Sequence, residues 1–140
     1  MPDVAPLANE LRLAIHRMTR RMRQQHPTHD LTLTQISALA IIWREGPITA
    51  GDLAVREQVR PPSITRVVDG LESAGAVIRK DNPADGRQVL VEITEDGIRR
   101  MESYVEAREA WLAQLLAELP PKDRETLHRA AVILNELAGH

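Results

Sequence analysis

The chain has 140 residues, of which 43% are hydrophobic, so it has the size of one domain and enough apolar residues to build a core. It contains no cysteine, which excludes a thiol-based redox sensor and a zinc site held by thiolates. The formal charge is −2 but is unevenly spread, because residues 58–68 contain two arginines and no acidic residue, whereas residues 101–140 are acidic.

The N-terminal segment, residues 1–30, is predicted to contain an amphipathic helix. Its apolar residues recur at spacings of 4, 4, 3 and 4, which places them on one helical face: Leu7, Leu11, Ile15, Met18 and Met22. Residues 1–9 lack the basic region and apolar core of a secretion signal, and no later segment has the roughly 18 apolar residues of a membrane span. We therefore expect a cytoplasmic protein with no membrane partner.

The next predicted helix, which begins after Thr32 and ends at Gly46-Pro47, has clear sequence signals at both ends. Thr32 is followed by Gln35 at the spacing of a capping box, and the pattern stops at Gly46-Pro47. One face of this helix is apolar and is expected to be buried: Ile36, Leu39, Ala40 and Trp43. On this basis Trp43 is interpreted as a core residue rather than as a surface for stacking.

A helix-turn-helix is predicted after this element. Thr49 and Asp52 have the spacing of a second capping box, which begins a short helix that continues to about Glu57. Residues 58–60 form the turn, and residues 61–62 are two prolines, which suit the first turn of the next helix because its amides have no intrahelical partner. Gly75 is expected to close that helix.

The second helix of this pair has two distinct faces. Its buried face is predicted to be apolar: Ile64, Val67, Val68 and Leu71. Its outer face is small, polar and basic: Pro62, Arg66, Asp69 and Ser73, with Ser63 and Thr65 at the sides. Such a face suits the DNA major groove, where an arginine donates two hydrogen bonds to guanine. The amides of Ser63 and Ile64 are expected to be free for a phosphate, and Gly70 indicates close packing or a suboptimal position.

A charged β-hairpin is predicted next, with residues 76–80 as its first strand and Asp85-Gly86 as a tight turn. In the second strand, apolar residues alternate as in a half-buried strand: Val89, Val91 and Ile93. Arg87 at the tip is suited to a narrow minor groove, where the negative potential is strongest, and Asp85 is expected to fix its direction. Arg79 and Lys80 are expected to extend the same basic face.

The C-terminal region, residues 98–140, is predicted to contain two helices separated at Pro120-Pro121. Thr94 is the expected cap of the first. The apolar stripes of residues 1–30 and 98–140 have no partner within residues 31–97, which are predicted to form a winged helix-turn-helix lobe. Packing across a two-fold axis covers both stripes, so a homodimer is predicted, and a monomer with folded-back end helices is the alternative. The fold class is mainly α with a small β-hairpin wing (α+β).

In these motifs the chain resembles the MarR family of bacterial transcriptional regulators. The resemblance lies in residues 62–72, Gly75, Arg79, the wing at 81–87 and the positions Val91, Ile93, Thr94 and Gly97. It implies a homodimeric winged-helix repressor of a pseudo-palindromic operator in double-stranded DNA, with the helix after the turn in the major groove and the wing in the minor groove. The implied DNA-binding residues are Arg60, Pro61, Pro62, Ser63, Thr65, Arg66, Asp85 and Arg87. Where the family often has aspartate directly followed by proline, Asn82 intervenes here, which implies a differently shaped wing tip.

The same resemblance implies a small aromatic or anionic effector, bound in the crevice between the dimerisation helices and the winged helix. The candidate lining residues are His16, Arg17, Arg20, Trp43 and Arg44. The arginine run of the first helix has a second interpretation, as a solvated strip or one that faces DNA phosphates.

Other functions remain as alternatives. These are a transcriptional activator of the same fold and a winged-helix protein-interaction module that does not bind DNA. The sequence contains no nucleophile elbow, phosphate-binding glycine loop or paired-carboxylate motif, so neither an enzyme nor a cofactor is expected. His26 and His29 are close in sequence, but no metal site is expected there.

Overall fold

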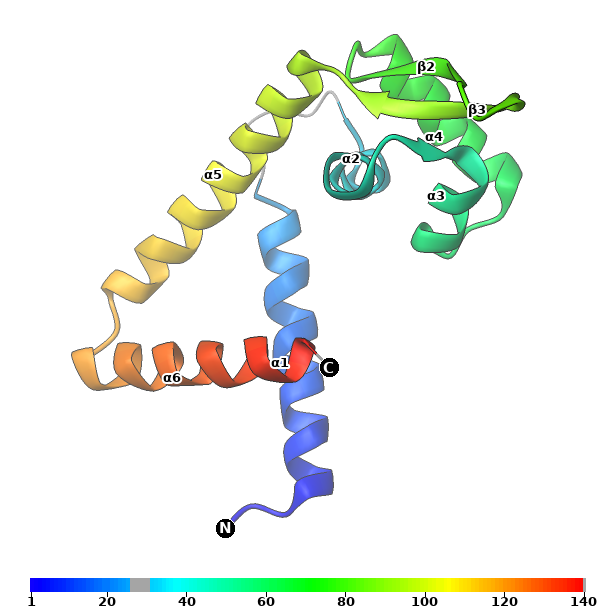
Figure 1. The fold of residues 1–140 in the computed structure, drawn as a ribbon. Helices are drawn as coiled ribbons and strands as arrows, with labels where there is room; N and C mark the ends of the chain where they lie inside the picture. The colour runs from blue at the N-terminus through cyan, green and yellow to red at the C-terminus, as the bar shows by residue number, and fades with distance from the viewer. Residues whose placement is uncertain (26–30, 140) are drawn as a thin grey trace.

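The computed structural model describes residues 1–25 and 31–139, so His26 and His29 lie outside the described residues. The elements in chain order are α1 (Val4–Arg23), α2 (Leu33–Glu45), β1 (Ile48–Thr49), α3 (Ala50–Glu57), α4 (Pro61–Ser73), β2 (Val77–Asn82), β3 (Asp85–Ile93), α5 (Glu95–Ala117) and α6 (Pro121–Ala138). The strands form one antiparallel sheet in the order β1-β3-β2 (Figure 1). The predicted winged helix, mainly α with a small sheet, is confirmed.

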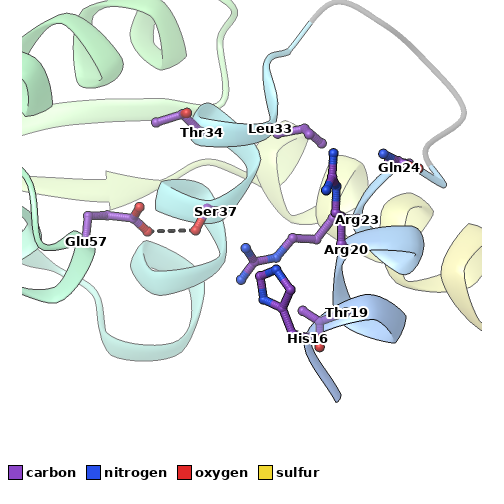
Figure 2. A pocket seen from close by; sticks show the side chains of 9 residues that line it. All are labelled: His16, Thr19, Arg20, Arg23, Gln24, Leu33, Thr34, Ser37 and Glu57. Atoms are coloured by element: carbon purple, nitrogen blue, oxygen red, sulfur yellow. Dashed lines mark hydrogen bonds between the residues drawn. The ribbon is translucent and has the colours of Figure 1, made fainter. Parts of the chain in front are cut away.

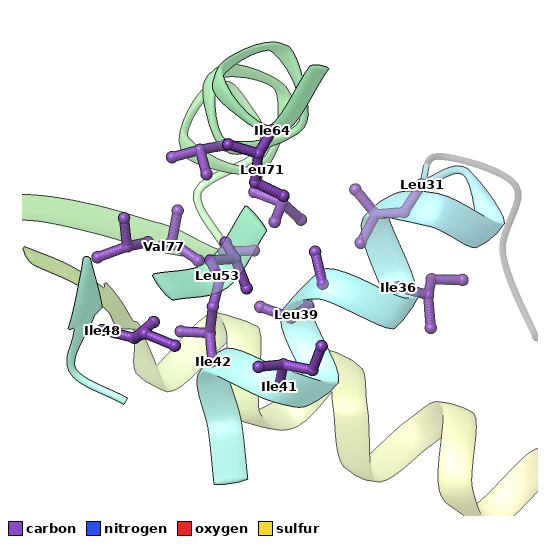
Figure 3. Packing of buried hydrophobic residues seen from close by; sticks show 14 of the residues in the cluster. Leu31, Ile36, Leu39, Ile41, Ile42, Ile48, Leu53, Ile64, Leu71 and Val77 are labelled. Carbon is purple, nitrogen blue, oxygen red and sulfur yellow. The ribbon is translucent and has the colours of Figure 1, made fainter. Parts of the chain in front are cut away.

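The hydrophobic core lies where α2, α3, α4, the sheet and the first turns of α5 meet. Leu39, Leu53 and Leu71 come from three different helices, and each is fully enclosed (Figure 3). Burial of one such side chain contributes about 1.5–3 kcal/mol. Met101 and Tyr104 of α5 belong to the same cluster, so the packing of the winged-helix lobe continues into the long helix.

Helix α4 buries the predicted face. Ile64, Val68 and Leu71 are at most 1% exposed, and Val67 packs against the same cluster. The helix ends where expected, because Gly75 has a φ of +79°, a left-handed conformation that glycine adopts without a steric penalty. The amide of Ala76 then donates to the carbonyl of Leu71 and closes the helix end.

The interpretation of Trp43 as a core residue is wrong, because 37% of this side chain is exposed. Helix α2 lies in the middle of the lobe and is buried over most of its circumference: Ile36, Ala38, Leu39, Ile41 and Ile42. The buried side of α2 is therefore centred on residues such as Leu39 and Ile42, and Trp43 lies at the edge of that side. Periodicity alone could not place this centre, since the helix has apolar residues on more than one face.

The predicted helix starts are confirmed. Thr32 and Gln35 form a reciprocal capping box, with distances of 3.1 Å from Gln35 N to Thr32 Oγ1 and 2.8 Å from Thr32 N to Gln35 Oε1. Thr49 Oγ1 accepts from the amide of Asp52, and Thr94 Oγ1 from that of Gly97. Each bond satisfies a donor that the helix itself leaves without a partner.

The hairpin turn differs from the prediction. Asn82 pairs with Asp85, so Pro83 and Ala84 form the two-residue turn, and Asp85 and Gly86 already belong to β3. The amide of Ala84 donates to Asn82 Oδ1 at 2.9 Å, a local bond by which asparagine stabilises turns. The first strand is accordingly Val77–Asn82, longer than the expected 76–80.

The three remaining helical segments extend away from the lobe, and we call α1, α6 and the part of α5 after Tyr104 the arms (Figure 1). All residues of α1 and α6 are described, and none of them is buried. The guanidinium of Arg21 lies 5.1 Å from the ring centroid of Trp111, which links α1 to α5. Within residues 1–25 and 31–139, no helix is both long and apolar enough to cross a membrane.

Candidate nucleic-acid interface

The turn between α3 and α4 sets the orientation of α4 relative to α3. Gln58 adopts a left-handed conformation with φ 57°, and Val59 packs against the core. Arg60 is extended, with ψ 149°, as expected for a residue that precedes proline. Pro61 and Pro62 then occupy the first turn, so a rigid segment presents the start of α4.

The amides at the start of α4 are not free for a phosphate, contrary to the expectation. The amides of Ser63 and Ile64 both donate to the carbonyl of Arg60, at 3.0 and 3.2 Å. Pro61 and Pro62 have no amide hydrogen to donate. Any recognition by this helix end must therefore use side chains rather than its backbone.

The outer face of α4 carries the side chains that the sequence predicts. Pro62, Ser63, Thr65 and Arg66 are all exposed. The Thr65 hydroxyl donates to the carbonyl of Pro61 at 3.1 Å, which orients it and leaves its lone pairs outward. Arg66 makes no ion pair or hydrogen bond with any described side chain, so its guanidinium retains all five donors.

A steric contact favours the close-packing interpretation of Gly70. A Cβ at residue 70 would collide with the side-chain amide of Gln35, the end of a flexible side chain that would have to move aside. Gln35 is the same residue that completes the capping box of α2. One side chain therefore closes the start of α2 and also occupies the space that Gly70 leaves on α4.

Arg79 is not available to extend the basic face, because it braces β2 against α4. Its guanidinium lies 2.6 Å from Asp69 Oδ1 and 2.7 Å from Glu72 Oε1. The hydrogen bond with Asp69 is the main cause that raises the pKa of Arg79. Lys80 is also paired, with Glu92 at 2.6 Å. The expectation that these two cations face DNA is therefore revised, and Arg79 instead fixes the angle between helix and wing.

Arg87 lies in β3, three residues after the turn, and is exposed. Asp85 Oδ1 accepts from the backbone amide of Arg87 at 3.1 Å. The sequence predicted that Asp85 fixes the direction of Arg87. In the structure Asp85 binds the backbone amide of Arg87 and makes no bond with its guanidinium. Asn82 Nδ2 donates to Gln88 Oε1 at 3.0 Å, so a side-chain hydrogen bond joins the two strands next to the turn.

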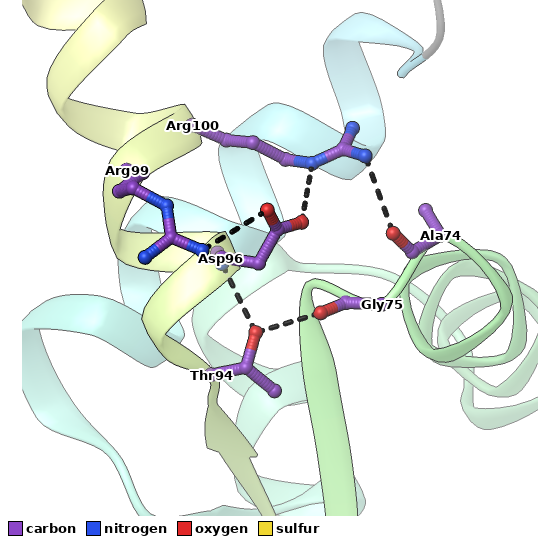
Figure 4. A network of polar contacts seen from close by, with 7 residues as sticks. Ala74, Gly75, Thr94, Asp96, Arg99 and Arg100 are labelled. Atoms are coloured by element: carbon purple, nitrogen blue, oxygen red, sulfur yellow. Dashed lines mark hydrogen bonds and ion pairs between the residues drawn. The ribbon is translucent and has the colours of Figure 1, made fainter.

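The base of the long helix is tied to the end of α4. Arg100 donates to Asp96 Oδ2 at 3.1 Å and to the carbonyl of Ala74 at 3.2 Å, while Thr94 Oγ1 donates to the carbonyl of Gly75 at 2.7 Å (Figure 4). These bonds connect the two helices where they meet. A rotation of α5 would therefore displace the end of α4.

Two of the predicted effector residues line a pocket of about 420 Å³ between α1 and α2 (Figure 2). His16 and Arg20 face it, whereas Arg44 lines a neighbouring pocket of about 500 Å³. Arg17 and Trp43 line neither. The prediction missed Arg23, Arg56 and Arg108. Arg23 stood in the arginine run, but nothing in the sequence showed that α5 brings Arg108 beside it.

These features define a winged helix-turn-helix protein. It presents an exposed arginine, Arg66, on α4, the second helix of the helix-turn-helix. The family model described as MarR family matches residues 31–89. An HTH-type transcriptional regulator of Mycobacterium bovis is 44% identical over 130 residues, covering 93% of this chain and 91% of the relative. The chain therefore belongs to the MarR family of transcriptional regulators.

Solved structures agree in fold. A MarR family protein from Bacillus stearothermophilus has a TM-score of 0.77 and 26% identity, with 98% of this chain and 96% of that chain covered. A mutant of MepR from S. aureus, bound to an oligodeoxyribonucleotide, has a TM-score of 0.69 and 20% identity, with 94% and 97% covered. At 20% identity this second likeness concerns the fold.

Proposed function

We propose that the protein is a homodimeric, ligand-responsive repressor that binds a pseudo-palindromic operator in double-stranded DNA. The observation that carries the proposal is the outer face of α4, where Arg66 is exposed and unpaired among the described residues, on a helix braced by Arg79. A free arginine on a rigid helix is the arrangement that direct readout of guanine requires. The relative MepR, whose fold is shared, has been solved with an oligodeoxyribonucleotide bound.

The proposed DNA contacts divide into three groups. Ser63, Thr65 and Arg66 contact base edges in the major groove. Arg60, Pro61 and Pro62 lie at the start of α4. The compact proline rings and the extended backbone of Arg60 allow the phosphate backbone of DNA to approach. On the wing, Arg87 enters the minor groove, and Asp85 holds the backbone amide that positions it.

The arms supply the proposed dimer interface. Several large apolar side chains on α1, α5 and α6 remain exposed in one chain: Leu7, Leu11, Ile15, Leu115, Leu127, Ile133 and Leu137. A two-fold dimer would cover them, and would place the two α4 helices about 34–36 Å apart, one turn of DNA. A small aromatic or anionic effector is proposed to bind in the crevice near His16, Arg20 and Arg44. The protein would act in the cytoplasm, on nucleoid DNA, by binding rather than by catalysis.

The test is selection of bound fragments from the source genome with purified protein at about 150 mM salt, since phosphate contacts weaken as salt rises. Footprinting of the enriched DNA should reveal an inverted repeat whose half-sites are about one helical turn apart. Its position relative to the neighbouring promoter distinguishes repression from activation. If no fragment is enriched over shuffled DNA, by the parent or after removal of bound ligand, the proposal fails.

A further inference from the structure

The two pockets beside α2 form one continuous recess. They share the lining residues Arg23, Leu33, Ser37 and Glu57. The second pocket, of about 500 Å³, is bounded by the end of α1, by α2, by the end of α3 and by α5. This volume falls within the range of about 300–1,000 Å³ that small-molecule sites occupy. The recess lies between the lobe and the arms, so its lining comes from both.

The second pocket has an excess of positive charge. Four arginines line it: Arg23, Arg44, Arg56 and Arg108. Glu57 is the single acidic residue among the described lining residues, and its carboxylate already accepts from the Ser37 hydroxyl at 2.8 Å. Arg56 pairs with Glu45 at 3.2 Å, outside the lining. Within the described residues, Arg23, Arg44 and Arg108 have no carboxylate partner.

Arg108 is the least satisfied of these cations. Its Nε is buried and has no hydrogen-bond partner among the described residues. Burial, and then the charge of Arg23, lower the pKa of Arg108. A guanidinium that is partly desolvated beside a second one is unfavourable unless an anion lies between them. Arg23 and Arg108 therefore bring two positive charges to this recess, and no described carboxylate forms an ion pair with either of them.

We propose that this recess binds a small anion with two or more negative charges, of the diphosphate or polycarboxylate class, held by Arg23, Arg44 and Arg108. Three unpaired guanidinium groups exceed what one monovalent carboxylate neutralises, and their planar forks match phosphate and carboxylate oxygens. This proposal rests on the proposed function, because it names the chemical class of the effector.

The position of the recess gives the anion a way to regulate. Arg23 and Arg108 belong to the arms, whereas Arg44 belongs to the lobe. An anion held by all three fixes the angle between arm and lobe, and that angle sets the separation of the two α4 helices in the dimer. It alters DNA binding to the extent that it binds one arrangement more tightly than the other.

The test is calorimetric titration of the full-length protein, without DNA, with pyrophosphate, citrate and benzoate at matched ionic strength. Pyrophosphate or citrate should bind with a dissociation constant at least about tenfold lower than that of benzoate. The variants R23Q and R108Q, on two different helices, should each lose about tenfold in that affinity. R99Q is the matched control, because Arg99 lies on α5 outside the lining and pairs with Asp96.

Several outcomes would overturn the proposal. These are benzoate binding as tightly as the multivalent anions, no anion binding at all, or unchanged affinity in both R23Q and R108Q. Loss of non-specific DNA affinity in these two variants, without anion binding by the parent, would instead make the cluster a DNA-phosphate contact. The genomic selection is independent, since anion binding with no enriched DNA would overturn the proposed function and leave the anion site in place.

Discussion

The winged-helix lobe and the arms have similar apolar residues but differ in how far these are covered. In the lobe, side chains from three helices and the sheet enclose one another, and residues such as Leu39 and Leu53 have no exposed surface. In the arms, Ile133 is 56% and Leu137 60% exposed. The apolar residues of the lobe are therefore covered within one chain, whereas those of the arms stay exposed, and the proposed dimer would cover them. Substitutions in the lobe and in the arms should therefore have different consequences.

The lobe should depend most on its buried leucines. Leu39→Ala removes a fully enclosed side chain and should lower the free energy of unfolding by about 2–5 kcal/mol, because the surrounding helices cannot collapse into the cavity. Denaturant titration of the purified protein measures the change. Val55→Ala, on the exposed side of α3, is the matched control and should cost about 0.5 kcal/mol or less. Equal losses in the two variants would contradict this view of the core.

The arms should respond in their association rather than in their folding. Ile133→Asp places a charge on the apolar face of α6 and should raise the dimer dissociation constant at least about tenfold, since burying such a side chain contributes about 1.5–3 kcal/mol. Sedimentation equilibrium measures it, and circular dichroism should show the helices retained. Asn135→Asp adds the same charge on the same helix and should leave the dimer intact. A dimer unchanged by Ile133→Asp would remove α6 from the interface.

DNA binding should depend on two arginines in different ways. Arg66→Ala should cost about 1–3 kcal/mol of operator binding and relax the preference at one base pair, because base-edge hydrogen bonds are lost. Arg87→Ala should weaken binding with less loss of base discrimination, and Asp85→Ala should imitate it partly by loosening the wing backbone. Titrations against the footprinted operator and single-base variants measure both quantities. Arg124→Ala on α6 is the control. Equal operator affinity of all variants would contradict the assignment of α4 and the wing as the DNA-binding surface.

The smallest expected effect concerns the contact between α2 and α4. Gly70→Ala should displace Gln35 and break the capping box, which offsets the roughly 0.5–1 kcal/mol that alanine gains over glycine in a helix. In a Gln35→Ala background that gain should appear in full. A double-mutant cycle by thermal denaturation should therefore give a coupling of about 0.5–1 kcal/mol. A coupling of zero would mean that the two side chains do not compete for this space.

Local signals in the sequence determined much of the fold. Thr32 and Thr49, each three residues ahead of a capping partner, predicted the starts of α2 and α3. Thr94 predicted the start of α5, because such a threonine accepts from an amide of its own helix. The two prolines and Gly75 marked the ends of α4 for equally local reasons, and its hydrophobic period identified the face that is buried. The exposed position of Arg66 followed from that same period.

The remaining features depend on contacts between segments that are distant in the chain, so they could be seen only in the folded protein. The burial of α2 on several faces excluded Trp43 from the core, which periodicity within the helix could not show. Arg79 looked like a DNA-facing cation until α4 placed two carboxylates beside it. Arg108, 85 residues after Arg23 in sequence, meets it only because α1 and α5 converge beside α2. Capping and helical periodicity act over a few residues, whereas ion pairs and pockets form between elements, so the latter appear only once the chain has folded.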